Sequence, residues 1–292
     1  MNFTEELARL TVLIDQALLQ YLPAINTYPA VIYESMHYSV FAGGKRLRPA
    51  LVLSCARAVG GREKDVLKAA CAIELLHTYS LIHDDLPAMD DDDLRRGKPT
   101  NHKVFGEATA ILAGDSLLTM CFELLAFLPV ESELKCRVIG EISQAAGVQG
   151  LISGQVMDLT CAETEMNLQT LNYIHTCKTG ALFKASARAG AILAKASEES
   201  LALLTIYAEK IGLAFQIIDD ILDIEGNEDK IGKLVGSDLK NQKTTYPVLL
   251  GLDEARIMAH QMVIEAREIL AKFGREADFL RELAGYILHR EC

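Results

Sequence analysis

Apolar residues recur at helical spacing along nearly the whole of this 292-residue chain, and this pattern constrains the fold more than any other feature. The N-terminal segment places Leu10, Ile14 and Leu18 on one stripe. The segment 200–224 is apolar on more than one face, which is typical of a helix at the centre of a bundle. Clear alternating strand patterns are missing. The sequence therefore predicts an all-α fold of about ten or more helices and, because no Gly/Ser/Pro-rich linker divides it, one domain over residues 1–292.

Charge and cysteine usage exclude several classes of protein. The net charge of −11 disfavours binding to nucleic acid or to an anionic membrane, so neither partner is expected. Seven cysteines without a C-x-x-C pair indicate reduced thiols rather than a disulfide framework or a zinc site. The longest uncharged run, 142–157, is shorter than the roughly 18–20 apolar residues of a membrane span, and "MNFTEELARL" lacks a signal layout. These features predict a soluble cytoplasmic enzyme or binding protein.

Two groups of aspartates stand where carboxylates are costly. One, "HDDLPAMDDDD" (83–93), begins at the C-terminal end of a helix expected from about Asp65, where the helix dipole favours cations instead. The other, "DDILD" (219–223), lies on the buried helix, and its Asp219 and Asp223 share a face. Buried or clustered negative charges are stable only when a positive charge pairs with them. A divalent cation can supply this charge, and it needs few protein ligands when phosphates occupy its other coordination sites. Magnesium fits better than calcium or zinc, although "DDDD" alone is more typical of a solvated loop.

Grouped cations complement these acids. "GGKRLRP" places Lys45, Arg46 and Arg48 at a glycine turn before a helix, where backbone N–H groups and guanidinium forks bind phosphate well. Arg95 and Arg96 directly follow the first aspartate group. Each isolated cation is more typical of a solvated surface, but together they predict two anion sites. One is bridged by metal to the aspartates, and the other is held directly by Lys and Arg.

The ordered set of motifs resembles the trans-isoprenyl diphosphate synthase family. "DDLPAMD" is similar to the first aspartate-rich motif of that family, D-D-x4-D, and "DDILD" to the second, D-D-x-x-D. "GGKRLRP", "GQVMDL", "KTG", "FQIIDD" and "GKLVGSDLKNQKTTYP" follow in the family's order, so the likeness extends from about residue 33 to 250. Within the family the likeness is greatest to the bacterial enzymes that make farnesyl diphosphate. It implies helices around a central cavity, a homodimer, and diphosphate substrates bound with magnesium, three ions per site.

The resemblance also implies roles for individual residues. The expected magnesium ligands are Asp84, Asp85, Asp90, Asp219 and Asp223. The expected isopentenyl diphosphate site consists of Lys45, Arg48, His77 and Arg96. The expected allylic diphosphate site consists of Arg95, Lys178, Thr179, Gln216, Lys233 and Lys243, of which all but Lys243 are also assigned to catalysis. Gln155, Asp158 and Asp238 are expected to support these residues, and Asp220 is not expected to bind metal directly.

The implied reaction is ionisation of an allylic diphosphate, attack by isopentenyl diphosphate and loss of a proton. Tyr79 and Ser80, five and four positions before Asp84, are expected to set product length, and an aromatic ring at position 79 accompanies a fifteen-carbon product in this family. Geranylgeranyl or geranyl diphosphate is the alternative product. A terpene cyclase, a silent partner subunit and a metal-storage protein are rival classes that leave the paired cations or the intact motifs unexplained. His289 and Arg290 are a thin version of the family's basic tail and receive no role.

Overall fold

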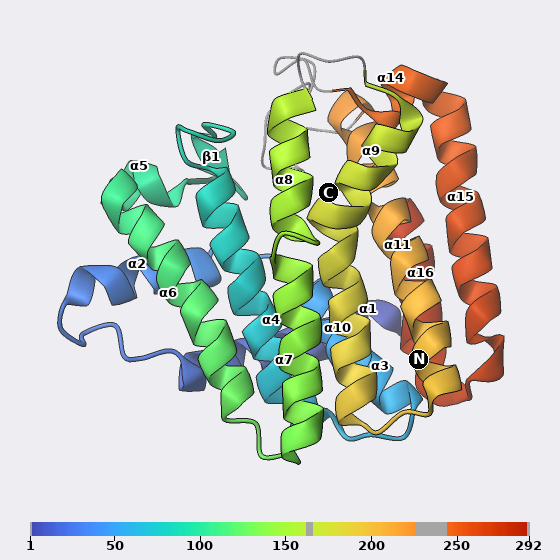
Figure 1. The fold of residues 1–292 in the computed structure, drawn as a ribbon, viewed down its shortest axis with the longest axis horizontal. Helices are drawn as coiled ribbons and strands as arrows, with labels where there is room; N and C mark the ends of the chain where they lie inside the picture. The colour runs from blue at the N-terminus through green and yellow to red at the C-terminus, as the bar shows by residue number, and fades with distance from the viewer. Residues whose placement is uncertain (1, 162–165, 226–243, 291–292) are drawn as a thin grey trace.

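The computed structural model describes residues 2–161, 166–225 and 244–290, and it confirms the predicted all-α fold (Figure 1). In chain order the helices are α1 (Phe3–Tyr21), α2 (Ala30–Val40), α3 (Leu47–Ala58), α4 (Glu63–Asp84), α5 (Asn101–Phe105), α6 (Glu107–Ala126), α7 (Ser132–Ala146), α8 (Leu151–Thr160), α9 (Leu168–His175), α10 (Ala181–Leu193), α11 (Glu198–Glu225), α14 (Tyr246–Leu250), α15 (Leu252–Ile269) and α16 (Asp278–His289). The shorter elements are the strands β1 (Leu94–Arg95) and β2 (Lys98–Pro99), the π-helical turn η2 (Thr176–Gly180), and the 3-10 turns η3 (Leu270–Lys272) and η4 (Arg275–Ala277). The assignment of the whole chain to one domain stays a prediction.

Helix α10 lies near the centre of the bundle. It packs against α3, α7 and α11, and small side chains let its neighbours approach closely. A Cβ atom at Gly190 would lie only 2.1 Å from the carbonyl oxygen of Val52 in α3, so a larger residue there would push these two helices apart. Helix α4 packs against α3 and α6, and α11 packs against α15, which completes a continuous apolar core.

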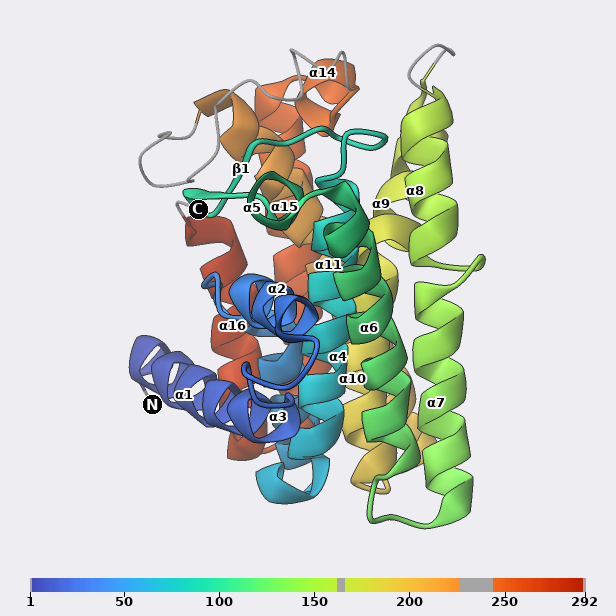
Figure 2. The same ribbon diagram turned by 90° about the vertical axis from the view of Figure 1, so that its left-hand side faces the viewer.

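The two helices that carry the aspartate motifs run in the same direction. Figures 1 and 2 both show the C-terminal ends of α4 and α11 at the upper end of the bundle, close to β1 and α14. The sequence did not reveal the short β1–β2 hairpin, in which Leu94 pairs with Pro99 and Arg95 with Lys98. Four residues of extended backbone are too few to show a strand pattern. The hairpin nevertheless determines where the two arginines after the first aspartate group lie.

Two helices are long and apolar enough to cross a membrane by length and composition, namely α6 and α11. The core helix of a soluble protein passes the same test, and 39% and 50% of the respective apolar windows are buried inside this bundle. Helix α11 also ends with Asp219, Asp220 and Asp223, which a membrane interior would exclude. Their composition is therefore weak evidence for a span, and the expectation of no membrane partner stays a prediction.

Candidate active site

The first aspartate group is folded into a tight turn at the end of α4. Asp84 is the last helical residue, and its carbonyl oxygen accepts a hydrogen bond of 2.9 Å from the backbone N–H of Asp90. The N–H of Asp91 bonds to the carbonyl oxygen of Leu86 at 3.2 Å. This turn brings the backbone of Asp90 back to that of Asp84 although five residues separate them, so the first and last aspartates of the D-D-x4-D motif lie together.

Asp85 lies on a different side of the helix end and is engaged inside the protein. Nε of Arg95 donates to both carboxylate oxygens of Asp85, at 2.7 and 2.9 Å, and Nη2 lies 2.5 Å from Oδ1. The Asp85 side chain is 3% exposed, and the β1–β2 hairpin supplies the arginine. In this structure Asp85 and Arg95 bond to each other. The predicted contacts of Asp85 with metal and of Arg95 with diphosphate stay predictions.

The charge on Asp84 is not neutralised by a direct ion pair in the described part of the chain. Burial raises the pKa of Asp84 to about 6, and the positive charge of Lys178 opposes this rise. Lys178 lies on η2 and donates to Oδ2 of Asp158 in α8 at 2.7 Å. A Cβ at Gly154 would lie 2.3 Å from the backbone nitrogen of Lys178, so "GQVMDL" requires its glycine for α8 to approach η2. The structure therefore brings Asp158 and Lys178 together within electrostatic reach of Asp84.

A chain of hydrogen bonds joins η2 to the second aspartate motif. Oγ1 of Thr179 donates to Oε1 of Gln216 at 2.9 Å, and Nε2 of Gln216 donates to Oδ1 of Asp220 at 3.1 Å. The backbone N–H of Tyr246 donates to Oδ2 of Asp220 at 3.0 Å, and His175 lies 3.5 Å from the same oxygen. π-helical turns are frequent at functional sites, and this one turns Lys178 and Thr179 toward different partners. Asp220 is thus a buried anchor, and its lack of direct metal binding stays a prediction.

Asp219 is the more open of the two adjacent aspartates in α11, with 41% of its side chain exposed. Its Oδ1 atom lies 2.6 Å from Nη2 of Arg290, directly after α16. Burial raises the pKa of Asp219, and Arg290 opposes this rise. Asp223 follows one turn later and is half-buried. Sequence reasoning gave Arg290 no role, because nothing in the local sequence indicates a partner 71 positions away.

The cations expected to bind isopentenyl diphosphate converge on α4 from two loops. Nη1 of Arg48 lies 3.3 Å from Nε2 of His77. Nη1 of Arg96 donates to the carbonyl oxygen of Gly43, and a Cβ at Gly44 would lie 2.6 Å from the Arg96 guanidinium carbon. The glycine pair, with φ values of +113° and +114°, therefore makes room for Arg96.

Burial, followed by the charges of Arg48 and Arg96, lowers the pKa of His77 well below its ordinary value, so this histidine is neutral at pH 7. Burial lowers the pKa of Arg48 to about 10, and its Nε atom is buried without a hydrogen-bond partner among the described residues. Lys45 lies 5.2 Å from the centre of the Tyr286 ring. The Nε donor of Arg48 therefore suits an anionic ligand.

Arg46 differs from its neighbours in "GGKRLRP". Its three guanidinium nitrogens bond to Asp15 at 2.8 Å, to Glu74 at 2.6 Å and to the carbonyl oxygen of Val40 at 2.6 Å. The side chain is only 2% exposed. Arg46 therefore fixes the turn and does not contribute to the anion site that the sequence suggested for the cluster as a whole.

The residues expected to set product length lie one turn below Asp84. Tyr79 is buried, and its ring packs edge-to-face on His83 at 5.3 Å between centres. His83 in turn lies against α6, where its Nε2 atom is 3.1 Å from the carbonyl oxygen of Ile111. Ser80 is also buried and donates to the carbonyl oxygen of His77 at 2.9 Å. Both positions are thus rigidly held beneath the first aspartate group.

Several expected residues lie outside the described part of the chain, namely Lys233, Asp238 and Lys243. Gln155 is described and buried, and both its side-chain amide atoms are without partners. Among the described residues, no group of three or more His, Cys, Asp or Glu side chains converges to hold a metal on its own. Such open carboxylates suit magnesium, which keeps water or substrate phosphate in most of its coordination sites.

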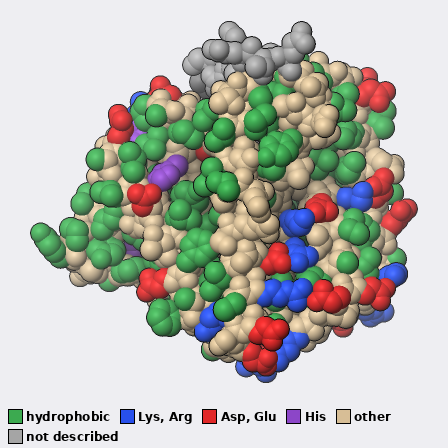
Figure 3. All heavy atoms as spheres, viewed as in Figure 1, with side chains coloured by type: hydrophobic (Ala, Val, Ile, Leu, Met, Phe, Trp, Pro, Cys, Tyr) green, Lys and Arg blue, Asp and Glu red, His purple; other side chains and the backbone are tan. Residues whose placement is uncertain are grey.

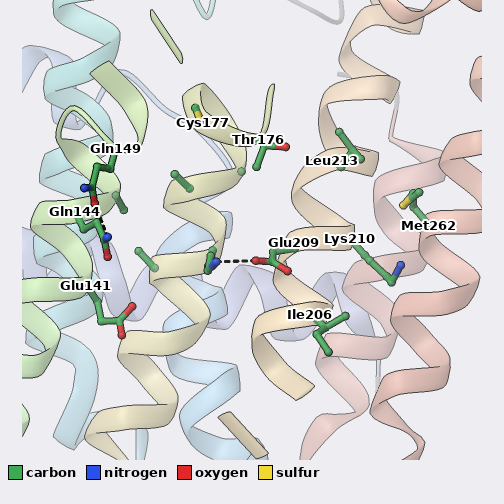
Figure 4. A pocket seen from close by; sticks show the side chains of 15 residues that line it. Glu141, Gln144, Gln149, Thr176, Cys177, Ile206, Glu209, Lys210, Leu213 and Met262 are labelled. Carbon is green, nitrogen blue, oxygen red and sulfur yellow. Dashed lines mark hydrogen bonds and ion pairs between the residues drawn. The ribbon is translucent and has the colours of Figure 1, made fainter. Parts of the chain in front are cut away.

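Small hollows lie beside both aspartate groups. One of about 100 Å³ is lined by Asp158, Lys178, Gln216 and Asp220, and another of about 30 Å³ by Asp85 together with the two arginines of the hairpin. A larger hollow of about 510 Å³ lies elsewhere, between α7, α10, α11 and α15. Figure 4 shows its polar rim, where Lys184 donates to Glu209 at 2.7 Å. This larger pocket touches η2, but none of the predicted site residues is among the residues that line it.

The bundle and its paired acidic and cationic groups define a helical enzyme that handles anionic substrates, and comparison with known proteins identifies which kind. The polyprenyl synthetase family matches residues 29–278, and the chain belongs to this family. The chain is 50% identical to farnesyl diphosphate synthase of Bacillus subtilis (strain 168) over 90% of each sequence. It is 46% identical to geranylgeranyl diphosphate synthase of Cyanophora paradoxa over 95% of this chain and 93% of the other. The protein is a prenyltransferase.

A solved structure with the same fold is that of a geranyltransferase from Helicobacter pylori complexed with magnesium and isoprenyl diphosphate. It superposes with a TM-score of 0.86 at 32% identity and covers 99% of this chain and 97% of that one. The all-α architecture expected from the resemblance is therefore confirmed, whereas the roles of the individual residues stay predictions.

Proposed function

We propose that this prenyltransferase condenses isopentenyl diphosphate head-to-tail with dimethylallyl and then geranyl diphosphate, and releases farnesyl diphosphate. The observation that carries the proposal is the arrangement at one end of the bundle. Asp84 ends α4 there, and Asp219 lies in the last two turns of the parallel helix α11. Lys178 acts electrostatically on Asp84, and Arg290 and Arg48 act on Asp219. Carboxylates and cations so arranged suit two diphosphates bound at once. The predicted setting is a soluble cytoplasmic enzyme.

Magnesium fits the chemistry of the carboxylates in the two motifs. Asp84 and Asp90 would hold it on one side, and Asp219 and Asp223 on the other, with three ions per site. The solved Helicobacter pylori geranyltransferase is complexed with magnesium and isoprenyl diphosphate, which supports this assignment. When bound, magnesium neutralises the charge that develops on the departing diphosphate.

The chain's own residues then position and separate the two substrates. Arg48, Arg96 and Lys45 would bind the isopentenyl diphosphate, and the neutral His77 would donate one hydrogen bond to it. Lys178 would bind the allylic diphosphate from the opposite side. The Thr179–Gln216 pair, anchored by Asp220, presents oxygen atoms close to where an allylic cation would form. The closely packed helices exclude water that would quench this cation.

The fifteen-carbon product is the finer part of the proposal, because related enzymes make both farnesyl and geranylgeranyl diphosphate. The buried Tyr79 ring on α4 supports the shorter product, since it fills space one turn below Asp84. Purified protein supplied with dimethylallyl and isopentenyl diphosphates and magnesium should give mainly the fifteen-carbon product on chromatography. The Tyr79→Ala variant should give longer chains, whereas Tyr173→Ala, which removes an exposed tyrosine, should not. An unchanged product pattern for Tyr79→Ala would refute the assignment of chain length to this residue.

A homodimer is the proposed assembly. Figure 3 shows hydrophobic side chains gathered on the face formed by α6 and α8. The exposed apolar side chains on these two helices are Ile111, Leu112, Ile152, Val156 and Leu159. An exposed apolar face of this kind suits contact with a second copy of the chain. Sedimentation equilibrium should give twice the 32.0 kDa mass of the chain, and Leu112→Glu should shift it toward the monomer.

A further inference from the structure

Arg290 occupies a place that its sequence context does not explain. Its Nη2 atom donates to the carbonyl oxygen of Phe215 at 2.6 Å and lies 2.6 Å from Oδ1 of Asp219. Its guanidinium carbon lies 3.7 Å from the centre of the Phe215 ring, and only 3% of the side chain is exposed. The residue after α16 therefore places a buried positive charge directly on the first aspartate of the "DDILD" motif.

A comparison with Arg46 shows that this is not a fully satisfied structural ion pair. Arg46 uses Nε and both terminal nitrogens in bonds to Asp15, Glu74 and Val40. Nε of Arg290 is instead buried without a hydrogen-bond partner in the described part of the chain. Buried donors are nearly always paired in settled structure. Arg48, which is expected to bind a substrate, has the same unpaired Nε.

Arg290 and Arg48 are also the two ends of one stack. The guanidinium of Arg48 lies 4.8 Å from the Phe183 ring, the Phe183 and Phe215 rings lie 5.3 Å apart, and Arg290 covers the far ring. The stack links α3, α10 and α11 to the end of α16. Cation–π contacts of this kind hold a guanidinium in place without satisfying its hydrogen-bond donors. A displaced Arg290 would therefore lose the contact with Phe215 together with that to Asp219.

We infer that Arg290 is an internal counter-ion that competes with divalent metal for Asp219. Nη2 of Arg290 already lies at contact distance from Oδ1, and a metal ion bound to the same carboxylate would come close enough to the guanidinium for strong repulsion between the two cations. Loading of metal and diphosphate therefore displaces Arg290 from Asp219 and releases the end of α16 from α11. Arg290 is a positioning residue: it keeps the open aspartate of the second motif neutralised until the metal arrives. The inference rests on the proposed metal role of Asp219.

Manganese(II) with inorganic diphosphate tests the competition without turnover, because electron paramagnetic resonance counts the unbound ion. Arg290→Gln should lower the manganese concentration at half-saturation about three- to tenfold relative to wild type. Arg290→Lys keeps the positive charge but loses the planar guanidinium group, so its half-saturation concentration should lie between those of Arg290→Gln and wild type. The matched control is Arg275→Gln, which removes an exposed arginine and should bind as wild type does. In the Asp219→Asn background, Arg290→Gln should bring no tightening. Equal or weaker binding by Arg290→Gln would overturn the inference.

A second readout follows Arg290 itself. In protein labelled with ¹⁵N-arginine, the Nε–H signal that Arg290→Gln abolishes should shift when manganese-free magnesium and inorganic diphosphate are added to the wild type. An unchanged signal at saturation would also overturn the inference. The proposed function fails differently, because wild-type protein would then bind no divalent ion in the presence of diphosphate.

Discussion

The two aspartate motifs both place adjacent carboxylates near the same end of the bundle, but they surround these carboxylates with different partners. In each, two adjacent aspartates at the end of a long helix point to different surroundings, because neighbouring residues are about 100° apart around a helix. Asp85 and Asp220 are the inner members, each buried and bonded within the protein. Asp84 and Asp219 are the outer members, to which the proposed function assigns the metal. If that assignment holds, each pair combines one structural and one functional carboxylate, and the spacing alone does not say which is which.

The two motifs differ in which of their adjacent aspartates has a positively charged partner. In the first motif the inner Asp85 bonds to the cation Arg95, while the outer Asp84 has no direct ion pair among the described residues and feels the more distant charges of Lys178 and Arg95. In the second motif the arrangement is reversed, because the inner Asp220 bonds to neutral N–H donors and the outer Asp219 bonds to a cation. On the proposed magnesium roles, the first motif would accept metal directly, whereas the second would have to exchange one cation for another.

The largest expected effect comes from removing either outer carboxylate. Asp84→Asn and Asp219→Asn should each lower kcat/KM for farnesyl diphosphate formation by about a thousandfold, because each weakens the stabilisation of charge on the leaving diphosphate. Steady-state assays with labelled isopentenyl diphosphate measure this loss.

The free energy of unfolding of the metal-free proteins, measured by thermal unfolding, should differ between these two variants. Asp219→Asn leaves Arg290 without its counter-ion and should lower the unfolding free energy by about 1 kcal/mol. Asp84→Asn removes a carboxylate that no direct ion pair neutralises, and it should not lower stability. Full activity in either variant would remove the corresponding carboxylate from the proposed site.

Replacing the inner aspartates should mainly lower the free energy of unfolding. Asp85→Asn leaves the half-buried Arg95 without its nearest charged partner, with only the more distant Asp92 at 3.5 Å among the described residues, and should destabilise the protein by about 3 kcal/mol. Asp220→Asn loses only part of its bonding to Gln216 and Tyr246, whose donors are neutral, and should cost about 1–2 kcal/mol. Urea unfolding of the two variants measures the difference. A larger loss for Asp220→Asn than for Asp85→Asn would contradict the comparison.

The sequence predicted the helices, and where the aspartate groups lie on them, because both depend on local spacing. Helical periodicity identified α4 and α11, and the i, i+4 relation put Asp219 and Asp223 on one face. The partners could not be predicted in the same way. Arg290 reaches Asp219 across 71 positions, and Arg46 reaches Glu74 across 28 through packing between helices. Arg95 is only ten positions from Asp85, but a four-residue hairpin places it there.

The smallest expected effect uses pH to distinguish the two outer carboxylates. Burial raises the pKa of Asp84 from 3.8 to about 6 in the metal-free protein. Between these values the folded state binds a proton at Asp84 that the unfolded state does not, so the contribution of Asp84 to stability should fall by about 2 kcal/mol as pH rises from about 4 to about 6. This contribution is the stability of the wild type minus that of Asp84→Asn, because carboxylates with a lowered pKa, such as Glu6, affect both proteins alike. Asp253→Asn, at a carboxylate 94% exposed, should follow the wild type. Urea titrations across this range, with chelator present, compare the three proteins.

Metal binds the ionised carboxylate, so diphosphate-dependent magnesium affinity should weaken as pH falls through about 6. A stability difference between wild type and Asp84→Asn that does not fall as pH rises would show that Asp84 ionises without the cost of burial.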